Sequence, residues 1–337
     1  MPELPEVETI RRGLERVALG RRIASVELLS PRSFLGVNDD AREVLIGAEL
    51  IQIARRGKLL MLHLDKGFTL MAHLRMTGQL IFRDGASEAG GGYDGGLCVT
   101  DGRGSEPNND SETAGSEMAG SDTAGSETAG NAAEADFGGG YPSRSLIGEL
   151  PDRSTRVVIA FTDGSHLYFN DQRRFGYLKL IPTALLGEDD FLSRLGPEPL
   201  DADFTWRELR ECLPMHSSRP IKTALLDQQV IAGIGNIYAD ESLFLAGIHP
   251  ARPVCGLTVP AIKRLHAGIR SCLQQSLDDG GSTARDYVDA EGLRGEYLDL
   301  HAKVYGRSGQ PCPKCGRPIS KTRLAGRGTH FCAHCQR

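Results

Sequence analysis

Short apolar runs separated by turn residues occur on either side of a long polar stretch in the N-terminal part of the chain. Runs of this length, bounded by turns such as DKG and TDG, are typical of strands joined in hairpins. The pattern predicts an antiparallel β unit that is interrupted once. The predicted strands cover residues 58–64, 68–74, 79–82, 156–161, 166–169 and 177–181.

The apolar spacing changes to helical periods beyond Trp206. Over residues 259–277 apolar side chains recur every three or four positions, as on the buried face of an amphipathic helix. These positions are Ile262, Leu265, Ile269, Leu273 and Leu277. Another helix is predicted at 7–17, ahead of the strands. We therefore expect an α+β protein in which a β-rich domain joins a helical domain near residues 197–203.

The polar stretch at residues 84–150 has the composition of a low-complexity insertion. It contains SETAG, SEMAG, SDTAG and SETAG in tandem over residues 111–130, a repeat without an apolar face at helical or strand spacing. Such a sequence cannot offset the entropy of ordering itself. We predict a disordered surface loop, which the fold tolerates and which can be deleted without loss of activity.

Acidic residues concentrate in this insertion, which has 13 Asp and Glu against 2 Arg. The rest of the chain carries 37 Lys and Arg against 31 Asp and Glu, so the net charge of −5 conceals a basic body. Residues 307–337 hold 7 Lys and Arg and no Asp or Glu, which favours a nucleic-acid partner. An alternative role for the insertion is to compete with that partner at low salt.

The sequence predicts neither a membrane protein nor a secreted one. No apolar run approaches the roughly 18 residues that a bilayer-spanning helix needs. The first residues, MPELPEVE, are acidic where a signal peptide is basic and then apolar. We expect a cytoplasmic protein, and this compartment is reducing.

Two Cys-x2-Cys pairs near the C-terminus have the spacing of a four-thiolate zinc site. Disulfides are the alternative, but they would be strained within each tight pair and are disfavoured in a reducing compartment. Because four protein ligands leave no open position for water, one structural Zn²⁺ is expected to hold a ribbon folded. The predicted ligands are Cys312, Cys315, Cys332 and Cys335, while Cys98, Cys212, Cys255 and Cys272 are expected to be ordinary thiols.

The amino terminus, MPELPE, offers candidate chemistry. Removal of Met1 would expose the secondary amine of Pro2, and an α-amino pKa of roughly 7.7 to 8 leaves part of it unprotonated at neutral pH. Such an amine can attack an aldehyde-like carbon and form an iminium. Alternatively, the terminus frays and Glu3 and Glu6 serve only as capping charges of a helix.

The terminus MPELPEVET resembles the formamidopyrimidine-DNA glycosylase family, and the resemblance covers nearly all of the chain outside the insertion. It implies a bifunctional DNA glycosylase and abasic-site lyase of base excision repair. Such an enzyme excises oxidised purines (8-oxoguanine, formamidopyrimidines) through an N-terminal proline Schiff base with β,δ-elimination. The resemblance makes Pro2 the nucleophile, Glu3 the general acid that protonates the sugar ring oxygen, and Glu6 a proton relay.

Lys58, in the motif RRGK, also matches this family. The resemblance implies that it contacts the phosphate beside the lesion and assists the chemistry. The preceding Gly57 permits close approach of the backbone, which favours this role. A solvated charge at the end of a strand is the alternative.

Two further motifs match the family, HLRMTG at 73–78 and DQRRFG at 171–176. An enzyme that acts on a stacked base must extrude the nucleotide and fill the hole, which takes an apolar wedge and a hydrogen-bonding arginine. The resemblance implies that His73, Met76, Arg173 and Phe175 bind DNA. Considered alone, Met76 would be a core residue and Phe175 a strand residue.

The segment 221–247 has the pattern helix, glycine turn, helix, and resembles the family's helix-two-turns-helix. Its glycines, Gly233 and Gly235, precede a helix whose free amides would suit a phosphate. The resemblance implies DNA contacts by Lys222, Asn236 and Tyr238. A plain helical hairpin, with Asn236 as a helix cap, is the alternative.

The C-terminal part supplies two more matches. Arg327, between the cysteine pairs, is implied to belong to the catalytic set by gripping the phosphates that flank the lesion. A generic basic loop is the alternative. Residues 288–307 resemble the segment that closes over the flipped base, and Gly292 and Gly295 are consistent with a mobile lid.

The expected organisation has three parts. Residues 2–200 would form a catalytic antiparallel β-sandwich with flanking helices, 201–305 a helical domain with a helix-two-turns-helix, and 306–337 a zinc finger. The expected partner is double-stranded DNA with oxidised bases or abasic sites, bound by a monomer in the bacterial cytosol or nucleoid.

Two other functions stay open. An endonuclease VIII-like glycosylase would act on oxidised pyrimidines, but such enzymes usually begin Pro-Glu-Gly-Pro and this chain has Pro-Glu-Leu-Pro. A non-catalytic zinc-ribbon DNA-binding protein would not need a free amino-terminal proline.

Overall fold

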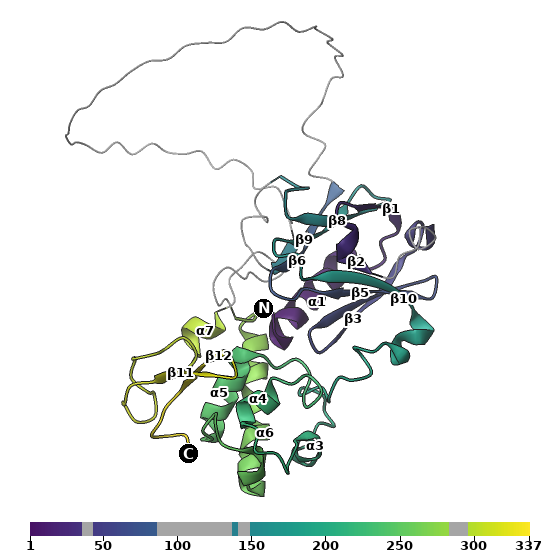
Figure 1. Ribbon diagram of the computed structural model, residues 1–337. Helices are drawn as coiled ribbons and strands as arrows, with labels where there is room; N and C mark the ends of the chain where they lie inside the picture. Colours follow the sequence, from purple (N-terminus) through teal and green to yellow (C-terminus); the bar gives the residue numbers. More distant parts are fainter. Residues whose placement is uncertain (36–42, 86–136, 141–148, 283–295) are drawn as a thin grey trace, which may run out of the picture.

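The computed structural model describes residues 1–35, 43–85, 137–140, 149–282 and 296–337 (Figure 1). The N-terminal domain is a β-sandwich of two five-stranded sheets, in the orders β1-β8-β9-β6-β7 and β2-β10-β5-β4-β3. Neighbouring strands are antiparallel, except that β2 and β10 are parallel. The strands are β1 (Ile23–Leu28), β2 (Phe34–Leu35), β3 (Leu50–Arg56), β4 (Leu59–Leu64), β5 (Phe68–His73), β6 (Gly78–Arg83), β7 (Phe137–Gly140), β8 (Thr155–Phe161), β9 (His166–Asp171) and β10 (Tyr177–Pro182).

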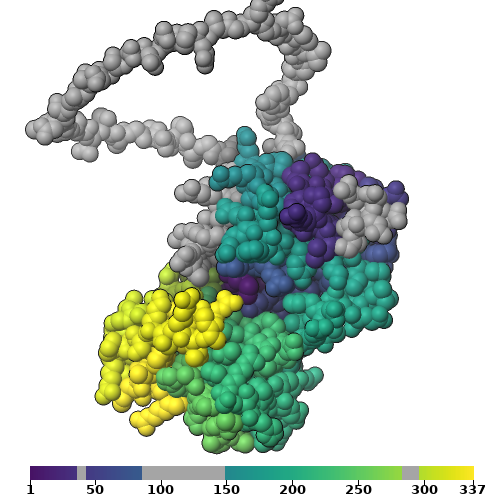
Figure 2. Space-filling model, in the orientation of Figure 1, coloured from purple at the N-terminus to yellow at the C-terminus, as the bar shows by residue number. Residues whose placement is uncertain are grey.

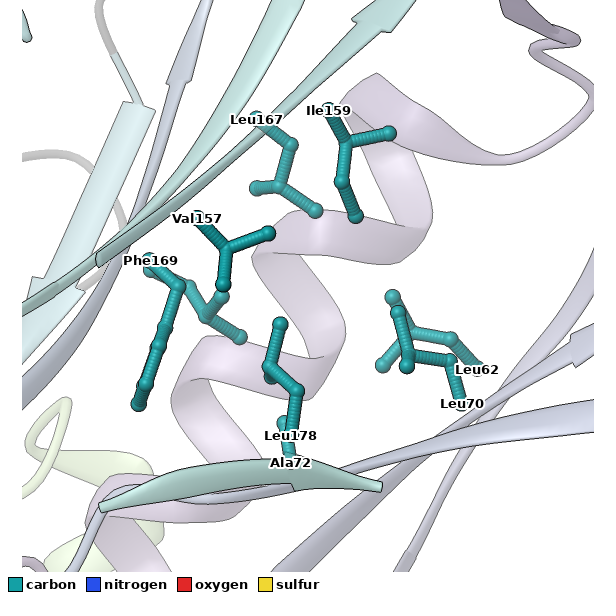
Figure 3. Close-up of a pocket in the computed structure, with 9 residues that line it drawn as sticks. Leu62, Leu70, Ala72, Val157, Ile159, Leu167, Phe169 and Leu178 are labelled. Carbon is teal, nitrogen blue, oxygen red and sulfur yellow. The ribbon is translucent and has the colours of Figure 1, made fainter. Parts of the chain in front are cut away.

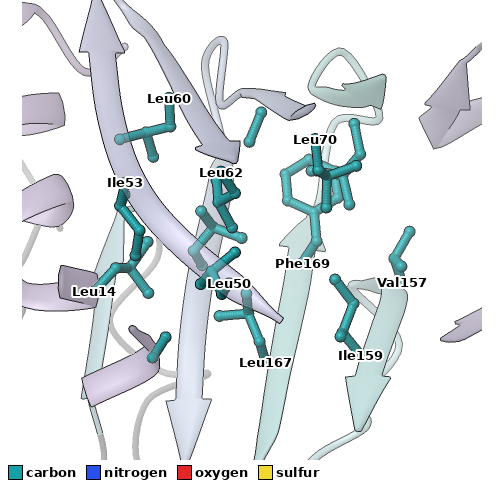
Figure 4. Close-up of a cluster of buried hydrophobic side chains, with 14 of the residues drawn as sticks. Leu14, Leu50, Ile53, Leu60, Leu62, Leu70, Val157, Ile159, Leu167 and Phe169 are labelled. Atoms are coloured by element: carbon teal, nitrogen blue, oxygen red, sulfur yellow. The ribbon is translucent and has the colours of Figure 1, made fainter. Parts of the chain in front are cut away.

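The two sheets enclose the core of this domain, because alternate residues of a strand point to the same face. Ile159, Leu167 and Phe169 from one sheet are buried in one cluster with Leu62 and Leu70 from the other (Figure 4). A small cavity between the sheets is lined by apolar side chains (Figure 3). Because no polar side chain lines it, this cavity is a packing gap in the core and has no hydrogen-bonding side chain for a polar substrate.

Helix α1 (Leu4–Ala18) packs its apolar stripe against the sandwich. The buried positions of this stripe recur every three or four residues, at Val7, Ile10, Leu14 and Ala18. The helix begins earlier than the predicted start at residue 7, because Pro5 is tolerated in a first turn and Glu3 and Glu6 form a capping box. The amino terminus is therefore fixed by the start of a helix.

The second domain is helical, with α5 next to α6 in its core. The helices described here are α3 (Trp206–Cys212), α4 (Ile221–Leu225), α5 (Asn236–Ala246), α6 (Val259–Asp278) and α7 (Tyr297–Leu300), and the 3-10 turns among the described residues of the chain are η1 (Pro31–Ser33), η4 (Thr183–Glu188) and η5 (Val254–Gly256). All five apolar positions predicted for α6 are buried. Gly268 allows α6 to approach α5, since a Cβ at this position would lie 2.9 Å from the Ser242 carbonyl oxygen.

The C-terminal ribbon is a hairpin of β11 (Ser320–Leu324) and β12 (Arg327–Phe331). It lies against α5 (yellow and green in Figure 1), where Phe244 packs with Val304, Ile319 and two of the cysteines. The N–H of His249 also donates to the carbonyl of Arg337 at 3.1 Å. The ribbon is thus attached to the helical domain by both apolar and main-chain contacts.

All six predicted strands are present, and they divide between the two sheets of the expected β-sandwich. β1, β2, β3 and β7 are not among the predicted strands. β7 falls inside the stretch 84–150, and the prediction of disorder is wrong for residues 137–140 because they pair with β6. The tandem repeats, Cys98 and positions 288–295 of the predicted lid lie outside the described residues. In the part of the chain that the structure describes, no helix combines the length and apolarity needed to cross a membrane.

Candidate active site

The N-terminal residues lie where the β-sandwich meets the helical domain and the ribbon. In Figure 2 the purple N-terminal atoms sit in a recess between these parts. The N–H of Leu4 donates to the Gly233 carbonyl at 3.0 Å, which binds the first turn of α1 to the loop before α5. A Cβ on Gly233 would lie 2.6 Å from Leu4, and one on Gly235 would lie 2.3 Å from Glu3 Cδ. These glycines therefore make room for the chain's own amino terminus and not for the phosphate that the sequence suggested.

The Glu3 carboxylate occupies the N-terminal end of α5. Its Oε2 accepts the N–H of Gly235 at 2.7 Å and its Oε1 accepts that of Ile237 at 3.0 Å. The unpaired amides at a helix start favour an anion, and here Glu3 supplies it. Burial raises the pKa of Glu3, although Lys58 and the Ile237 N–H act to lower it. Glu3 thus has a fixed position and keeps its proton to a higher pH than an ordinary carboxyl.

Glu6 lies beside Glu3 and is held by the helical domain. Its Oε2 accepts the N–H of Glu3 at 2.7 Å, and its Oε1 accepts the Tyr238 hydroxyl at 2.5 Å. The N–H and hydroxyl of Ser282 donate to Oε1 at 2.9 and 2.7 Å. The Tyr238 hydroxyl also lies 2.5 Å from Ser276 Oγ. The carboxylate of Glu6 is therefore part of a buried hydrogen-bond network that crosses from one domain to the other.

Lys58 is buried at the start of β4 and reaches the same loop. Its Nζ donates to the Ile234 carbonyl at 2.8 Å. Burial lowers the pKa of Lys58; the charges of Glu3 and Glu6 oppose this effect, and Arg327 adds to it. The pKa of Lys58 therefore depends on three other candidate residues from the sequence analysis, Glu3, Glu6 and Arg327.

The pKa of the terminal amine depends on the same four side chains. Burial lowers the pKa of the Met1 amine, the two glutamates raise it, and the lysine and arginine lower it. Pro2 itself is buried, and its nitrogen is part of a peptide bond while Met1 is present. A lowered pKa leaves more of an amine unprotonated and nucleophilic at neutral pH. The site thus suits an amine nucleophile.

The wedge motifs meet at one end of the sandwich, on the loops β5–β6 and β9–β10. Met76 and Phe175 are 40% and 55% exposed. Arg173 lies between them, with Nη1 3.3 Å from Met76 Sδ and Cζ 5.0 Å from the centroid of the Phe175 ring. Met76 is therefore not a core residue. His73 is buried, and burial lowers its pKa to about 3, so its imidazole is neutral at pH 7.

Buried polar contacts tie the ribbon hairpin to the helical domain. Lys222 Nζ lies 2.7 Å from Asp240 Oδ1 and donates to the Gly328 carbonyl at 2.8 Å. Asn236 Nδ2 donates to the same carbonyl at 3.0 Å. These contacts fix the residue next to Arg327, whose own side chain is exposed.

Lys222 and Tyr238 are placed differently from the prediction of direct DNA contacts. Lys222 is 1% exposed, and its ammonium has Asp240, Gly328 and Thr329 as partners. Tyr238 is fully buried, with its hydroxyl bonded inside the protein. In this conformation both side chains are buried and bonded to other parts of the protein.

Two buried carboxylates that the sequence did not single out position the site. Glu198, in the linker between the domains, accepts from Arg55 at 2.8 Å and Arg56 at 2.9 Å, and from the N–H of Gly57. This binds the turn before Lys58 to the linker. The other carboxylate, Asp240, accepts the His330 N–H at 2.9 Å in addition to pairing with a lysine. An acidic residue in the mostly apolar helix α5 was the only signal for Asp240.

The four C-terminal cysteines form a compact cluster. Their sulfurs all lie within 4.8 Å of one another, with 3.9 Å from Cys312 to Cys335 and 3.6 Å from Cys315 to Cys332. A tetrahedral ion with Zn–S bonds of about 2.3 Å would hold sulfurs about 3.8 Å apart. These four residues are free thiols in the structure, and their arrangement could hold a metal ion.

Comparisons with known proteins agree with this geometry. The model of the formamidopyrimidine-DNA glycosylase N-terminal domain matches residues 1–123, that of the H2TH domain 195–288, and that of the zinc finger found in FPG and IleRS 309–337. The formamidopyrimidine-DNA glycosylases of Gloeobacter violaceus and Bacillus subtilis are 38% and 36% identical to this chain, over 100% of it and 98% and 99% of their own lengths.

Solved structures of Lactococcus lactis Fpg have the same fold. A mutant of that protein in complex with Fapy-dG containing DNA has a TM-score of 0.75 and 32% identity over 100% of both chains. A complex of Lactococcus lactis Fpg with an abasic site containing DNA has a TM-score of 0.75 and 31% identity over 99% of both chains.

A β-sandwich, a helix-two-turns-helix domain and a four-cysteine ribbon that converge on the amino terminus define a DNA glycosylase scaffold. The chain belongs to the formamidopyrimidine-DNA glycosylase family. This confirms the resemblance inferred from the sequence and the α+β fold class.

Proposed function

We propose that the protein is a bifunctional DNA glycosylase and abasic-site lyase that removes oxidised purines from double-stranded DNA. The observation that carries this proposal is the arrangement of acids and a base around the amino terminus: Glu3 and Glu6 bond to each other's segment and to the helical domain, and Lys58 bonds to the loop that holds Glu3. Binding alone would not need buried acids and a buried lysine beside the first residues of the chain.

The residues divide the chemistry among them. The free amine of Pro2 attacks C1′ of the damaged nucleotide, and the base leaves as the C–N bond to it breaks. Glu3, the acid with a raised pKa, protonates the ring oxygen of the sugar, which opens to an iminium. Removal of a C2′ proton then expels the 3′ phosphate, and a second elimination expels the 5′ phosphate.

Three residues assist this sequence. Glu6, which accepts the Glu3 N–H, orients the terminus and relays protons. Lys58 and the exposed Arg327 hold the phosphates that flank the lesion, because cations beside the reacting sugar neutralise the leaving phosphates. Asn236 supports Arg327 through its bond to Gly328 and is partly accessible to the DNA backbone.

The exposed residues Met76, Arg173 and Phe175 would enter the duplex and replace the extruded nucleotide. His73 is neutral, so any contact it makes with a phosphate is a hydrogen bond and not an ion pair. The ion in the cysteine cluster would be one Zn²⁺ with a structural role, because four thiolates fill a tetrahedral site. The protein would act as a monomer in the bacterial cytosol.

The glycosylase for oxidised pyrimidines is the second candidate. A mutant of the related Lactococcus lactis protein was solved with Fapy-dG containing DNA, and the present chain has Pro-Glu-Leu-Pro directly after Met1. Both observations favour a purine lesion.

End-labelled duplexes test the proposal. A duplex with 8-oxoguanine opposite cytosine should be incised to a fragment with phosphate at both sides of the gap, and the same duplex with guanine should stay intact. Faster incision of a duplex with oxidised thymine opposite adenine would favour the pyrimidine enzyme. Binding to all duplexes with no incision would support the non-catalytic alternative.

A further inference from the structure

One buried carboxylate joins the two loops that carry the exposed wedge residues. Asp171 is 0% exposed. Its Oδ1 accepts the hydroxyl of Thr77 from the β5–β6 loop, and its Oδ2 accepts the N–H of Gly176 from the β9–β10 loop at 2.6 Å. Oδ1 also accepts the N–H of Arg173 at 3.2 Å, so the carboxylate bonds to both loops.

The Thr77 hydroxyl makes a second connection between the same loops. It accepts the N–H of Arg173 at 3.0 Å while donating to Asp171, which a hydroxyl can do at once. Thr77 is 6% exposed, so water does not compete freely for these bonds. Since Thr77 directly follows Met76, the hydroxyl sets the position of Met76 relative to Arg173.

The backbone of both loops is held away from its preferred conformations. Arg75 in one loop and Arg174 in the other have φ of 51° and 57°, in the left-handed region. Residues other than glycine adopt this region only when their surroundings hold them there. Asp171 can hold both loops in this conformation because its own backbone is fixed. Its carbonyl accepts from Arg156 Nε and its N–H donates to the Ser154 carbonyl, both at 2.8 Å.

We propose that the Thr77–Asp171 pair is a positioning element that holds the three exposed wedge residues as one unit. This inference rests on the proposed function, since a wedge is needed only to extrude a nucleotide from a duplex. In the structure the hydrogen bonds of both side chains go to the two wedge loops. Their loss should therefore slow extrusion and leave the chemistry at the sugar intact. An abasic site in a single strand needs no extrusion, and it separates the two effects.

Thr77→Val removes the hydroxyl and keeps the shape of the side chain. We expect excision of 8-oxoguanine from a duplex to fall at least about tenfold, because a misplacement of about 1 Å can cost roughly 100-fold. Cleavage of a single-stranded abasic oligonucleotide should change far less. Thr77→Ser, which keeps the hydroxyl, should restore the duplex rate.

Thr69→Val is the matched control. Thr69 is also fully buried, and its hydroxyl bonds to His63 at 2.8 Å and Thr183 at 2.9 Å, near the start of β5 and away from both loops. This variant should keep the ratio of duplex to single-strand rates even if it is less stable. A change in this ratio therefore indicates misplaced wedge residues and not a general loss of stability.

Equal losses on both substrates for Thr77→Val, or no loss on the duplex, would overturn the proposal. If that variant does not fold, Asp171→Asn makes the same test, because the amide nitrogen cannot accept a hydrogen bond and one loop loses its anchor. A wild-type protein without activity on either substrate would instead refute the proposed function itself.

Discussion

The Glu3 carboxylate and the Ile237 amide belong to different domains and are joined by a 3.0 Å hydrogen bond. Glu3 precedes α1 of the sandwich, and Ile237 lies in the first turn of α5. This bond places the proposed general acid at the positive end of a helix dipole. The second domain therefore sets the position and the electrostatics of the first residues of the chain.

Glu3→Gln should abolish the acid step. We expect single-turnover excision to fall by about 10²- to 10⁴-fold, the usual contribution of a general acid, while binding to an abasic duplex persists. Because burial raises the pKa of Glu3, the acid form is present below that pKa and is lost above it. The wild-type rate should therefore decline as pH rises through the Glu3 pKa, and Glu3→Gln should lack this decline. A variant with the wild-type rate and pH profile would contradict the role.

Lys58→Met should lower excision by about 10²- to 10³-fold, since it removes a cation from beside the reacting phosphates. The Ile234 carbonyl would keep the amide of Gln228 as a donor at 2.8 Å, so the loop should hold its shape. Lys66→Met is the control, because Lys66 lies on the exposed β4–β5 turn of the same domain. Equal rates for the two variants in a burst assay would argue against a catalytic part for Lys58.

Lys222→Met should destabilise the protein and not merely weaken its hold on DNA. Removal of one partner leaves Asp240 as an uncompensated buried charge, which costs about 3 to 5 kcal/mol. Urea unfolding measures this loss, and the double variant Lys222→Met with Asp240→Asn should recover part of it. Lys222→Met could instead leave stability unchanged and lower the salt dependence of DNA binding by the equivalent of about one phosphate contact. That result would support the DNA-binding role inferred from the sequence.

Loss of the metal should unfold the C-terminal ribbon and leave the β-sandwich folded. In Cys315→Ser we expect metal content to fall and DNA affinity to drop, because the hairpin with Arg327 is held in part by the cysteine cluster. The near-ultraviolet circular dichroism of the β-sandwich should stay unchanged. Metal analysis and DNA titration check this, with Cys255→Ser, an exposed thiol outside the cluster, as the control. Full affinity in a metal-free protein would contradict it.

The elements of the fold were predictable where their pattern is local. β9 contains a short apolar run bounded by turn residues, and the stripe of α6 follows the helical period, so both appear in the sequence. The local pattern does not show which strand joins which sheet, because strand pairing is non-local; the β-sandwich was expected from the family resemblance. β2 has only two residues and β7 is rich in glycine, and neither carries an apolar alternation that would mark a strand.

The candidate site was predictable in its reactive residues and not in their supports. Pro2, Glu3 and Lys58 stand in motifs that resemble a known family. Glu198 stands in no pattern that marks it, and Asp171 stands in the motif DQRRFG without a sign of its supporting role, since the partners of both lie far away along the chain or depend on the loop geometry. A motif also does not show which of its side chains are buried. The sequence therefore predicted a DNA contact for Tyr238, whose side chain is buried in the structure.

The central claim is that the amine of Pro2 becomes covalently joined to the damaged nucleotide. Borohydride reduction during reaction with a duplex containing 8-oxoguanine opposite cytosine, followed by peptide mapping, tests it most directly. Mass spectrometry first confirms that Met1 is absent. We expect a stable protein–DNA adduct whose crosslinked peptide begins at Pro2. A duplex that binds without being trapped, or a crosslink at Lys58, would contradict it.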